Sequence, residues 1–194
     1  MTKQRCGWCV GDPLYEAYHD QEWGVPVYDD QTIFEFLILE TFQAGLSWIT
    51  ILRKRENFRE ALDDFDYKKI ARYSEAKLEA LLQNPGIIRN KLKVKATVSN
   101  AQAFIEIQEE FGSFSKYIWS FVNHKPIQNS VKIYKEAPAT TAISDALSKD
   151  LKKRGFKFTG STVVYAHMQA TGMVNDHEVD CFRYAEVKSL GVKP

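Results

Sequence analysis

The sequence predicts an all-α protein that folds as one compact unit. Apolar residues recur with helical spacing along most of the chain, and capping residues and glycines separate these segments. No two segments show the paired alternation that strands need. With 194 residues, the chain is long enough for one domain with a proper core. We therefore expect a single domain over residues 1–194, without repeats or a linker.

The helices can be placed in order along the chain. The first carries Tyr15, Tyr18 and His19 on one face, because they fall at positions i, i+3 and i+4. Apolar residues between 33 and 38 have the spacing of a second helix. Further helices are expected over 75–83, 145–154 and from about 162. Their end signals are Ser74 and Ser144 as N-caps, and Gly155 and Gly172 as the glycines that follow a helix.

The middle of the chain is broken by Pro85-Gly86, after which apolar residues and then bases begin a new helix. Such a turn directs the free N–H groups of the second helix outward, where a phosphate can bind. The pattern fits a helix-hairpin-helix, and equally an ordinary helix connection with a glycine. The residues expected to contact DNA here are Gly86, Ile88, Arg89 and Lys91, with added charge from Lys93 and Lys95.

Two pairs of soft metal ligands stand near the ends of the chain: Cys6 with His19, and His177 with Cys181. The second pair has i, i+4 spacing, which predicts one face of a helical turn. Together the four can form a tetrahedral Cys2His2 shell for zinc that joins the termini. Cys9 leaves an alternative open, because Cys6-x-x-Cys9 could be the first pair and His19 an ordinary helix residue.

Composition excludes several classes. Three cysteines cannot all pair, and no charged start leads into an apolar stretch, so we expect reduced thiols and a cytoplasmic protein. No run is long enough to span a membrane. The net charge of +1 does not decide for or against nucleic acid. Basic clusters at 53–55, 89–95 and 149–157 fit either solvated helix faces or phosphate contacts.

One carboxylate, Glu40, ends an apolar stretch just before a turn of small residues. It must face solvent, be paired or be functional, because burying an unpaired carboxylate is costly. Aromatic residues mostly build cores. Rings combined with one carboxylate can also hold an extruded purine, since the rings stack on its faces and the acid binds its edge. Electrostatics in such a pocket would favour a cationic, alkylated base.

Sequence blocks along nearly the whole chain resemble the DNA-3-methyladenine glycosylase I family. They lie at 5–8, 12–15, 18–20, 22–26, 43–50, 86–89, 119–122, 144–149, 153–158 and 174–177, and the longest is Gln43-Ala44-Gly45-Leu46-Ser47-Trp48-Ile49-Thr50. The resemblance implies a helix-hairpin-helix DNA glycosylase fold with the hairpin near 74–100 and a zinc-clipped lobe from 1–25 and 160–194. It also implies excision of N3-methyladenine from alkylated double-stranded DNA, without strand cleavage.

The resemblance further assigns roles to residues. It implies one structural zinc on Cys6, His19, His177 and Cys181, with Cys9 outside the ligand set. It implies Glu40 as the catalytic carboxylate at the base edge, with Trp48 stacking on the base; the other base-binding residues are Tyr15, Tyr18 and Trp23. Gly45 and Leu46 lie on a turn beside this pocket and are expected to contact DNA, where Leu46 could fill the gap left by the flipped base.

Many helix-hairpin-helix glycosylases place an essential aspartate downstream of the hairpin glycine. This chain has no aspartate between Asp66 and Asp145. Glu106 and Glu109 lie in a Glu-rich, exposed segment, and the resembling family does without the aspartate. A base that is cationic through N3-methylation is already a good leaving group, so extrusion and positioning supply most of what the reaction needs.

Two rival functions remain. A non-enzymatic, zinc-clipped DNA-binding module would use the hairpin and the basic clusters only to bind phosphates, and Glu40 would then be superfluous. A zinc hydrolase would need an open position in the metal shell, which four protein ligands do not leave. We expect a monomer that acts as a hydrolase of N-glycosyl bonds in base-excision repair.

Overall fold

Helices form most of residues 3–190, the residues that the computed structural model describes. They are α1 (Pro13–Gln21), α2 (Asp30–Gln43), α3 (Trp48–Leu52), α4 (Arg55–Ala61), α5 (Tyr67–Ile70), α6 (Glu75–Gln83), α7 (Lys91–Phe111), α8 (Phe114–Ser120), α9 (Ala142–Lys153), α10 (Ser161–Ala170) and α11 (Phe182–Leu190). Two 3₁₀ turns, η1 (Asp63–Phe65) and η2 (Tyr134–Glu136), and two strands, β1 (Ile127–Gln128) and β2 (Val174–Asn175), complete them. The all-α prediction is confirmed.

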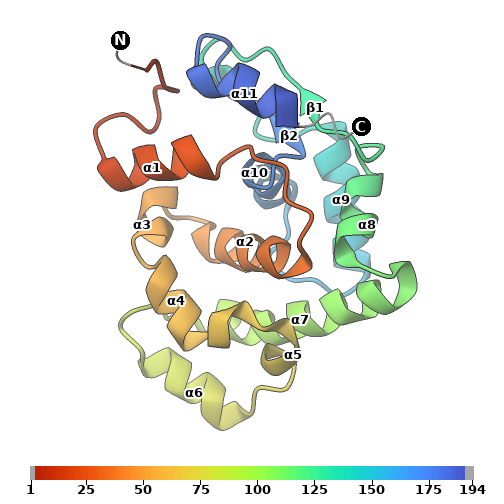
Figure 1. Ribbon diagram of the computed structural model, residues 1–194. Coiled ribbons are helices and arrows are strands. Elements are labelled where there is room, and N and C mark those ends of the chain that lie inside the picture. The colour runs from red at the N-terminus through yellow and green to blue at the C-terminus, as the bar shows by residue number, and fades with distance from the viewer. Residues whose placement is uncertain (1–2, 191–194) are drawn as a thin grey trace.

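Helix α2 lies at the centre of the molecule (Figure 1). It contacts α3, α7, α8 and α10, and its residues from Ile33 to Phe42 are all buried. A helix that is enclosed on all sides has no polar face, which explains its apolar sequence. Two carboxylates are nevertheless buried in it. Glu35 is paired with Arg55 at 2.6 Å, whereas Glu40 forms no ion pair with any residue in 3–190. Glu40 is only 4% exposed, so the solvent-facing interpretation of this residue is wrong.

The N-terminal segment contacts the start of α11, the last helix among residues 3–190. The backbone N–H of Phe182 donates to the carbonyl of Gln4 at 2.9 Å. Strands β1 and β2 pair in parallel, with Ile127 opposite Val174. The sequence does not predict this pair, because two residues are too few to show strand alternation.

Most predicted helix ends agree with the structure. Ser74 caps α6, and Gly155 and Gly172 follow α9 and α10 with φ of 96° and 69°. The predicted start of α9 is wrong, because Thr141 and not Ser144 is the N-cap. Ser144 is the third residue of the helix. The two side chains form a capping box, in which each oxygen accepts from the other residue's backbone N–H.

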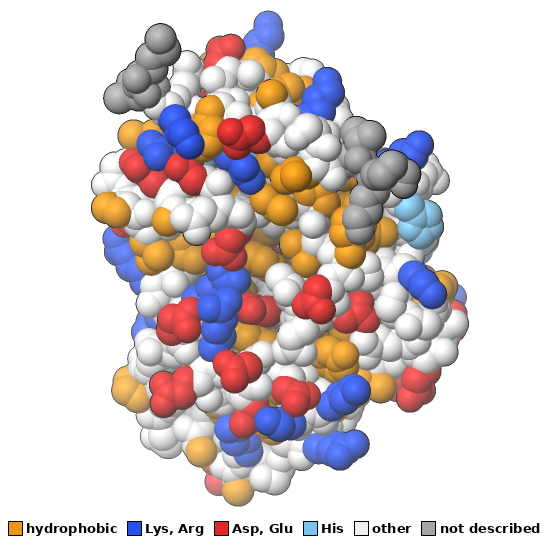
Figure 2. All heavy atoms as spheres, viewed as in Figure 1, with side chains coloured by type: hydrophobic (Ala, Val, Ile, Leu, Met, Phe, Trp, Pro, Cys, Tyr) orange, Lys and Arg blue, Asp and Glu red, His pale blue; other side chains and the backbone are white. Residues whose placement is uncertain are grey.

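Charged side chains of both signs are interspersed on the face seen in Figure 2. Many of them are paired, and the basic cluster at 53–55 is structural. Arg53 contacts Asp12, Arg55 contacts Glu22 and Glu35, and Lys54 donates to carbonyls of the turn after α6. Within residues 3–190, no helix is both long and apolar enough to cross a membrane.

Candidate functional site

The four predicted metal ligands come together in space. Cys6, His19, His177 and Cys181 are buried, and their ligand atoms all lie within 4.8 Å of one another. Cys6 Sγ is 3.6 Å from His177 Nδ1, and Cys181 Sγ is 3.4 Å from His19 Nε2. In a tetrahedral zinc shell with bonds of about 2.0–2.3 Å, neighbouring ligand atoms lie roughly 3.3–3.8 Å apart. The donor set and its spacing therefore fit a metal ion.

In each histidine ring, the nitrogen that faces away from the cluster lies at hydrogen-bond distance from an oxygen atom. His19 Nδ1 lies 2.8 Å from Asp20 Oδ1, and His177 Nε2 lies 3.0 Å from the carbonyl oxygen of Trp23. Arg5 in turn donates to Asp20 at 2.8 Å. Such outer contacts fix the tautomer of a metal-binding histidine and orient its ring. Nε2 of His19 and Nδ1 of His177 are thereby left facing the cluster.

The structure decides the open alternative at the metal site and corrects one detail. Cys9 lies outside the cluster, because its thiol donates to the carbonyl of Cys6 at 3.2 Å, and the alternative Cys6–Cys9 pair is not supported. His177 and Cys181 do not lie on a helix, since α11 begins only at Phe182. A turn closed by a 2.8 Å bond from the N–H of Cys181 to the carbonyl of Glu178 directs both side chains inward instead.

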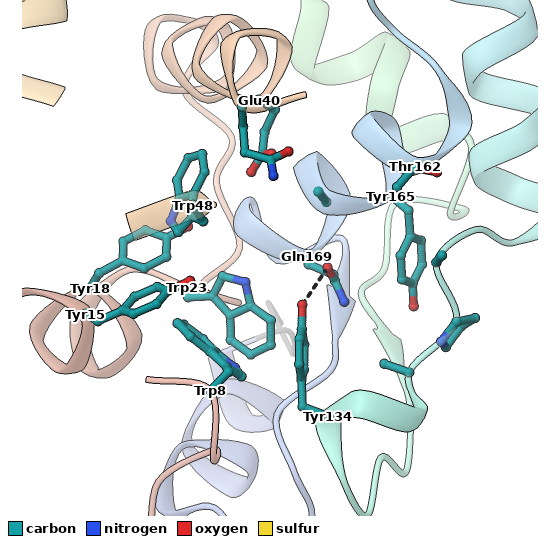
Figure 3. Close-up of a pocket in the computed structure, with 15 residues that line it drawn as sticks. Trp8, Tyr15, Tyr18, Trp23, Glu40, Trp48, Tyr134, Thr162, Tyr165 and Gln169 are labelled. Carbon is teal, nitrogen blue, oxygen red and sulfur yellow. Dashed lines mark hydrogen bonds between the residues drawn. The ribbon is translucent and has the colours of Figure 1, made fainter. Parts of the chain in front are cut away.

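A mainly aromatic pocket with a volume of about 300 Å³ lies beside the metal-ligand cluster. Its lining residues are Trp8, Tyr15, Tyr18, Trp23, Glu40, Gln43, Trp48, Tyr134, Ala137, Pro138, Ala139, Thr162, Tyr165, Ala166 and Gln169. Figure 3 shows rings from α1 and α3 on one side, α10 on the other, and Glu40 pointing between them. Cavities of this size and composition are typical of small-ligand sites.

The pocket is built directly on the metal-ligand cluster. The ring of Trp8 packs edge-on against Tyr15 at 4.7 Å and against Trp23 at 5.1 Å between ring centroids. The ring of Trp23 is in turn 4.6 Å from that of His177. Because Trp23 contacts both sites, a loss of order in the cluster would displace pocket walls.

Among residues 3–190, Glu40 is the only one that lines this pocket with a carboxyl group, and it is 4% exposed. No other residue among 3–190 donates a hydrogen bond to it or pairs with it. Loss of water raises the pKa of this carboxyl group from 4.5 to about 8, because burial disfavours the charged form. An unpartnered buried carboxyl at the end of an aromatic cavity is the arrangement expected of a ligand-binding group.

Three other polar atoms around the pocket are buried and have no hydrogen-bond partner within residues 3–190: Tyr18 Oη, Trp48 Nε1 and Trp8 Nε1. Folded proteins satisfy the large majority of such atoms, so three in one cavity indicate a site for a polar ligand. Burial also raises the pKa of Tyr15 to about 12 and raises that of Tyr18. Both phenols are therefore neutral near pH 7.

Two polar residues of the α10 wall, Tyr165 and Gln169, are held by hydrogen bonds. The buried carboxylate of Asp176 accepts from Tyr165 Oη at 2.7 Å, Gln169 Nε2 at 2.8 Å and Asn129 Nδ2 at 2.6 Å. Gln169 Oε1 also accepts from the hydroxyl of Tyr134 at 3.4 Å, the dashed line in Figure 3. These bonds fix the wall, so its shape is set before a ligand binds.

The turn that follows α2, which contains Gly45 and Leu46, lies beside the pocket. Gly45 has φ of 88°, a conformation that favours glycine, and the side chain of Leu46 is 38% exposed. Gln43, the last residue of α2, lines the cavity and donates through its side chain to the carbonyl of Leu46. An exposed leucine at a tight turn beside the cavity is placed to contact a molecule that approaches it.

Lys93 has a different role from the one predicted. It is 7% exposed, and its Nζ donates to the carbonyls of Phe42 at 3.0 Å and Ala44 at 2.7 Å. Burial lowers the pKa of this ammonium group. A cation that donates to the last carbonyls of α2 stabilises the end of that helix, so Lys93 is unable to contribute charge to a DNA-facing surface.

The segment between α6 and α7 is a turn at the predicted hairpin, but its details differ. Helix α7 begins at Lys91, not at the apolar residues, and the Asn90 side chain accepts from the N–H groups of Leu92 and Lys93. Those two amides are thus unavailable to a phosphate. Gly86 has no left-handed φ; an added Cβ would lie 3.2 Å from Asn57 Cβ.

The structure places the predicted residues Tyr15, Tyr18, Trp23 and Trp48 around Glu40 in one pocket. Sequence reasoning missed the other lining residues, among them Trp8, Tyr134, Tyr165 and Gln169. Two signals pointed to some of them. Trp8 lies two residues from a predicted metal ligand, and Tyr165 and Gln169 share a face of the predicted helix at i, i+4.

Comparison with known proteins identifies the family. A family model described as methyladenine glycosylase matches residues 8–184. The chain belongs to this family. DNA-3-methyladenine glycosylase 1 of Escherichia coli K12 is 51% identical over 181 residues, which cover 93% of this chain and 97% of that protein. A crystal structure of 3-methyladenine DNA glycosylase I superposes with a TM-score of 0.90 at 51% identity, covering 92% of this chain and 98% of that one.

A second solved structure is a single-residue variant of a 3-methyladenine DNA glycosylase I in complex with 3-methyladenine. It superposes with a TM-score of 0.89 at 36% identity, covering 97% of this chain and 98% of that one. Membership of the methyladenine glycosylase family confirms the resemblance, the fold and the enzyme class, a DNA glycosylase.

Glu106 and Glu109 are exposed on α7 and do not line the pocket, so neither replaces the missing aspartate there.

Proposed function

We propose that this chain binds N3-methyladenine after it flips out of alkylated duplex DNA and hydrolyses its N-glycosidic bond, without cleaving the strand. The observation that supports this most strongly is Glu40, a buried and unpartnered carboxyl at the end of an aromatic pocket. The names of the relatives point to the same base, and one relative was crystallised with it.

The pocket suits the faces and the edge of a methylated adenine. The rings of Tyr18 and Trp48 lie 5.6 Å apart at the Glu40 side of the cavity, and a purine can stack on them. Tyr15 and Trp23 complete that side. Glu40 then accepts hydrogen bonds from N–H groups on the edge of the base, which replace the water that burial removes.

Charge selects the damaged base. In the unliganded pocket Glu40 is mostly protonated near pH 7, because its pKa is about 8. Adenine in DNA carries a positive charge once N3 is methylated, and an adjacent cation favours the ionised carboxyl. The cationic base and the carboxylate therefore stabilise each other in the cavity. Unmodified adenine is neutral and gains no such attraction, so it binds more weakly.

The positive charge also makes the base a good leaving group. The bond between sugar C1′ and N9 breaks with its electron pair going to the base, which leaves as neutral N3-methyladenine. Water then adds to C1′ and releases a proton to solvent. The enzyme needs mainly to extrude and position the nucleotide, so the pocket does without an aspartate. No lysine among residues 3–190 lines the pocket, and a Schiff base with strand cleavage is not expected.

DNA contacts are proposed on two turns. The Gly45–Leu46 turn lies beside the cavity, and we propose that Leu46 fills the gap that the flipped base leaves in the stack. The α6–α7 turn presents the exposed side chains of Arg89 and Lys91 to phosphates, while Gly86 and Ile88 shape the turn itself.

The metal is proposed to be zinc, held by Cys6, His19, His177 and Cys181. When bound, it supplies a cross-link between the N-terminal segment and the turn before α11. Four protein ligands fill a tetrahedral shell and leave no position for a reacting water, so the role is structural. We also propose that the protein acts as a cytoplasmic monomer.

Release of the base is the direct test. Duplex DNA treated with a methylating agent is incubated with the protein, and released bases are separated by chromatography. The same DNA without protein corrects for spontaneous loss of the cationic base. N3-methyladenine should appear above this background, and the strand should stay intact until alkali is added. A DNA-binding module without enzymatic activity would bind the duplex and release no base above background, which would refute the proposal.

A further inference from the structure

Residues 157–159, between α9 and α10, form a loop that is fixed by buried side chains. Asn100 of α7 is fully buried; its Nδ2 donates to the carbonyl of Lys157 at 3.1 Å, and its Oδ1 accepts from the N–H of Lys157 at 2.7 Å. Ser148 of α9, also buried, donates to the carbonyl of Thr159 at 2.6 Å. The backbone on both sides of Phe158 is therefore held in place.

Phe158 is held in a conformation that phenylalanine disfavours. Its φ is 58°, in the left-handed region that side chains other than glycine rarely adopt. Its ring is 38% exposed, whereas Phe156, two residues earlier, is 2% exposed and belongs to the core. Packing of the Phe158 ring against the core therefore offsets little of the backbone strain at this residue. Strained backbone that presents an apolar ring to solvent is characteristic of contact sites for another molecule.

The surroundings of Phe158 indicate the chemistry of that molecule. A groove is lined by Leu92, Lys95, Ala96 and Ser99 of α7 together with Lys157 and Phe158. Leu92 is 69% exposed. Lys157 forms no ion pair with any residue in 3–190, whereas Lys95 Nζ lies 3.5 Å from Glu75 Oε2 in a solvent-exposed pair. The groove lining contains two cations and two exposed apolar side chains; its neighbouring carboxylate, Glu75, is exposed and pairs with Lys95 only at the surface, where an ion pair contributes little. This lining suits a partner that is both anionic and partly apolar. Nucleic acid, with phosphates beside sugars and bases, has this chemistry.

The residues that line the groove are close in sequence to two surfaces that face DNA in the proposed function. Leu92 directly follows Lys91 of the hairpin, and Thr162, at the pocket, lies four residues after Phe158. We propose that Lys95, Lys157, Leu92 and Phe158 form an additional duplex-binding surface, in which the lysines bind phosphates and the Phe158 ring packs on a sugar or base near the flipped nucleotide. This proposal rests on the proposed function, because that function brings a duplex to the pocket.

Phe158→Gly separates a contact role from a structural one. Glycine adopts φ of 58° without strain, so the variant should melt at a higher temperature than the parent. Its affinity for an undamaged duplex should fall roughly ten-fold through loss of one aromatic contact. Binding of free 3-methyladenine should not change. The matched control is Phe111→Ala, since Phe111 is also 38% exposed but lies at the far end of α7; this variant should bind DNA normally.

Lys157→Ala provides the second measurement. It should lower affinity for all duplex sequences and reduce the slope of log affinity against log salt by about one. Unchanged DNA affinity in both variants would overturn the proposal. So would a lower melting temperature of Phe158→Gly with joint loss of DNA and free-base binding, which would indicate a structural role. Base release by the parent chain is measured separately, so failure of the proposed function is distinguished from failure of this surface.

Discussion

Glu40→Gln should make the protein more stable and less active at the same time. The substitution keeps the size of the side chain but replaces a titratable carboxyl with a neutral amide. In the folded chain Glu40 is 4% exposed and has no partner, and its pKa is about 8 instead of 4.5. If Glu40 only stabilised the fold, its substitution would lower the free energy of unfolding of the protein. The sign of the measured change therefore distinguishes a ligand-binding role from a structural one.

The pKa difference gives the magnitude. A change from 4.5 to about 8 corresponds to roughly 5 kcal/mol between the charged group in the folded and unfolded chains. Because the folded-state pKa is the higher one, the folded chain holds the proton more tightly, and stability falls as the pH rises between these two values. From pH 5 to pH 8 this group alone should reduce the free energy of unfolding by about 3 kcal/mol.

Denaturant unfolding of both proteins at several pH values tests this reasoning. The glutamine variant lacks the group, so the free energy of unfolding of the variant minus that of the parent should grow by about 3 kcal/mol from pH 5 to pH 8. The other titrating groups are common to both proteins and cancel in the difference. A pH-independent difference would refute the assignment of the raised pKa to Glu40.

Activity should change in the opposite direction. Loss of a charge-assisted hydrogen bond costs about 1.5–3 kcal/mol, which is roughly a ten- to hundred-fold fall in excision of N3-methyladenine. Binding of the free base should weaken as well. Normal excision by a well-folded variant would mean that the base binds elsewhere, and the role of Glu40 in the proposed function would be lost.

Five further substitutions test the metal site, the DNA-facing turns and the end of α2. Cys181→Ser should lose the metal and much stability, whereas Cys9→Ser should keep both; metal analysis that shows full zinc in the first variant would contradict the ligand set. Gly86→Val crowds the α6–α7 turn and should weaken binding of every duplex while free-base binding stays normal; equal losses would indicate misfolding. Leu46→Ala should slow excision several-fold in single-turnover assays without affecting free-base binding, and unchanged excision would count against gap filling. Lys93→Met leaves two carbonyls at the end of α2 without a donor, so it should lower the melting temperature; an unchanged melting curve would show that the buried ammonium stabilises nothing.

Much of the fold could be predicted because it depends on local signals. The N-cap Ser74 and the glycines after α9 and α10 act within a few residues of themselves, and the structure confirms them. The start of α9 was missed for a similar local reason. Thr141 and Ser144 are both good capping residues, and only the capping box between them decides which one is the cap.

The environment of individual side chains could not be predicted, because it depends on distant contacts. In the sequence, Lys93 is one of several basic residues on a predicted helix. In the structure it is buried, because it packs against the end of α2. His177 and Cys181 have helical spacing, but the parallel pairing of β2 with β1 leaves only a turn before α11. Tyr134 reaches the pocket from a 3₁₀ turn that has no apolar periodicity at all.

The two buried carboxylates near the pocket explain why a cation is the expected ligand. Asp176 and Glu40 are buried to a similar degree, at 1% and 4% exposure. Asp176 accepts three hydrogen bonds from the protein, so its lost hydration is replaced within the fold. Glu40 accepts none, and its lost hydration appears as a pKa of about 8. A ligand that supplies hydrogen bonds alone replaces part of that hydration, whereas a ligand with hydrogen bonds and a positive charge also stabilises the ionised form. Discrimination between methylated and unmodified adenine can thus arise from the hydration of one carboxyl group.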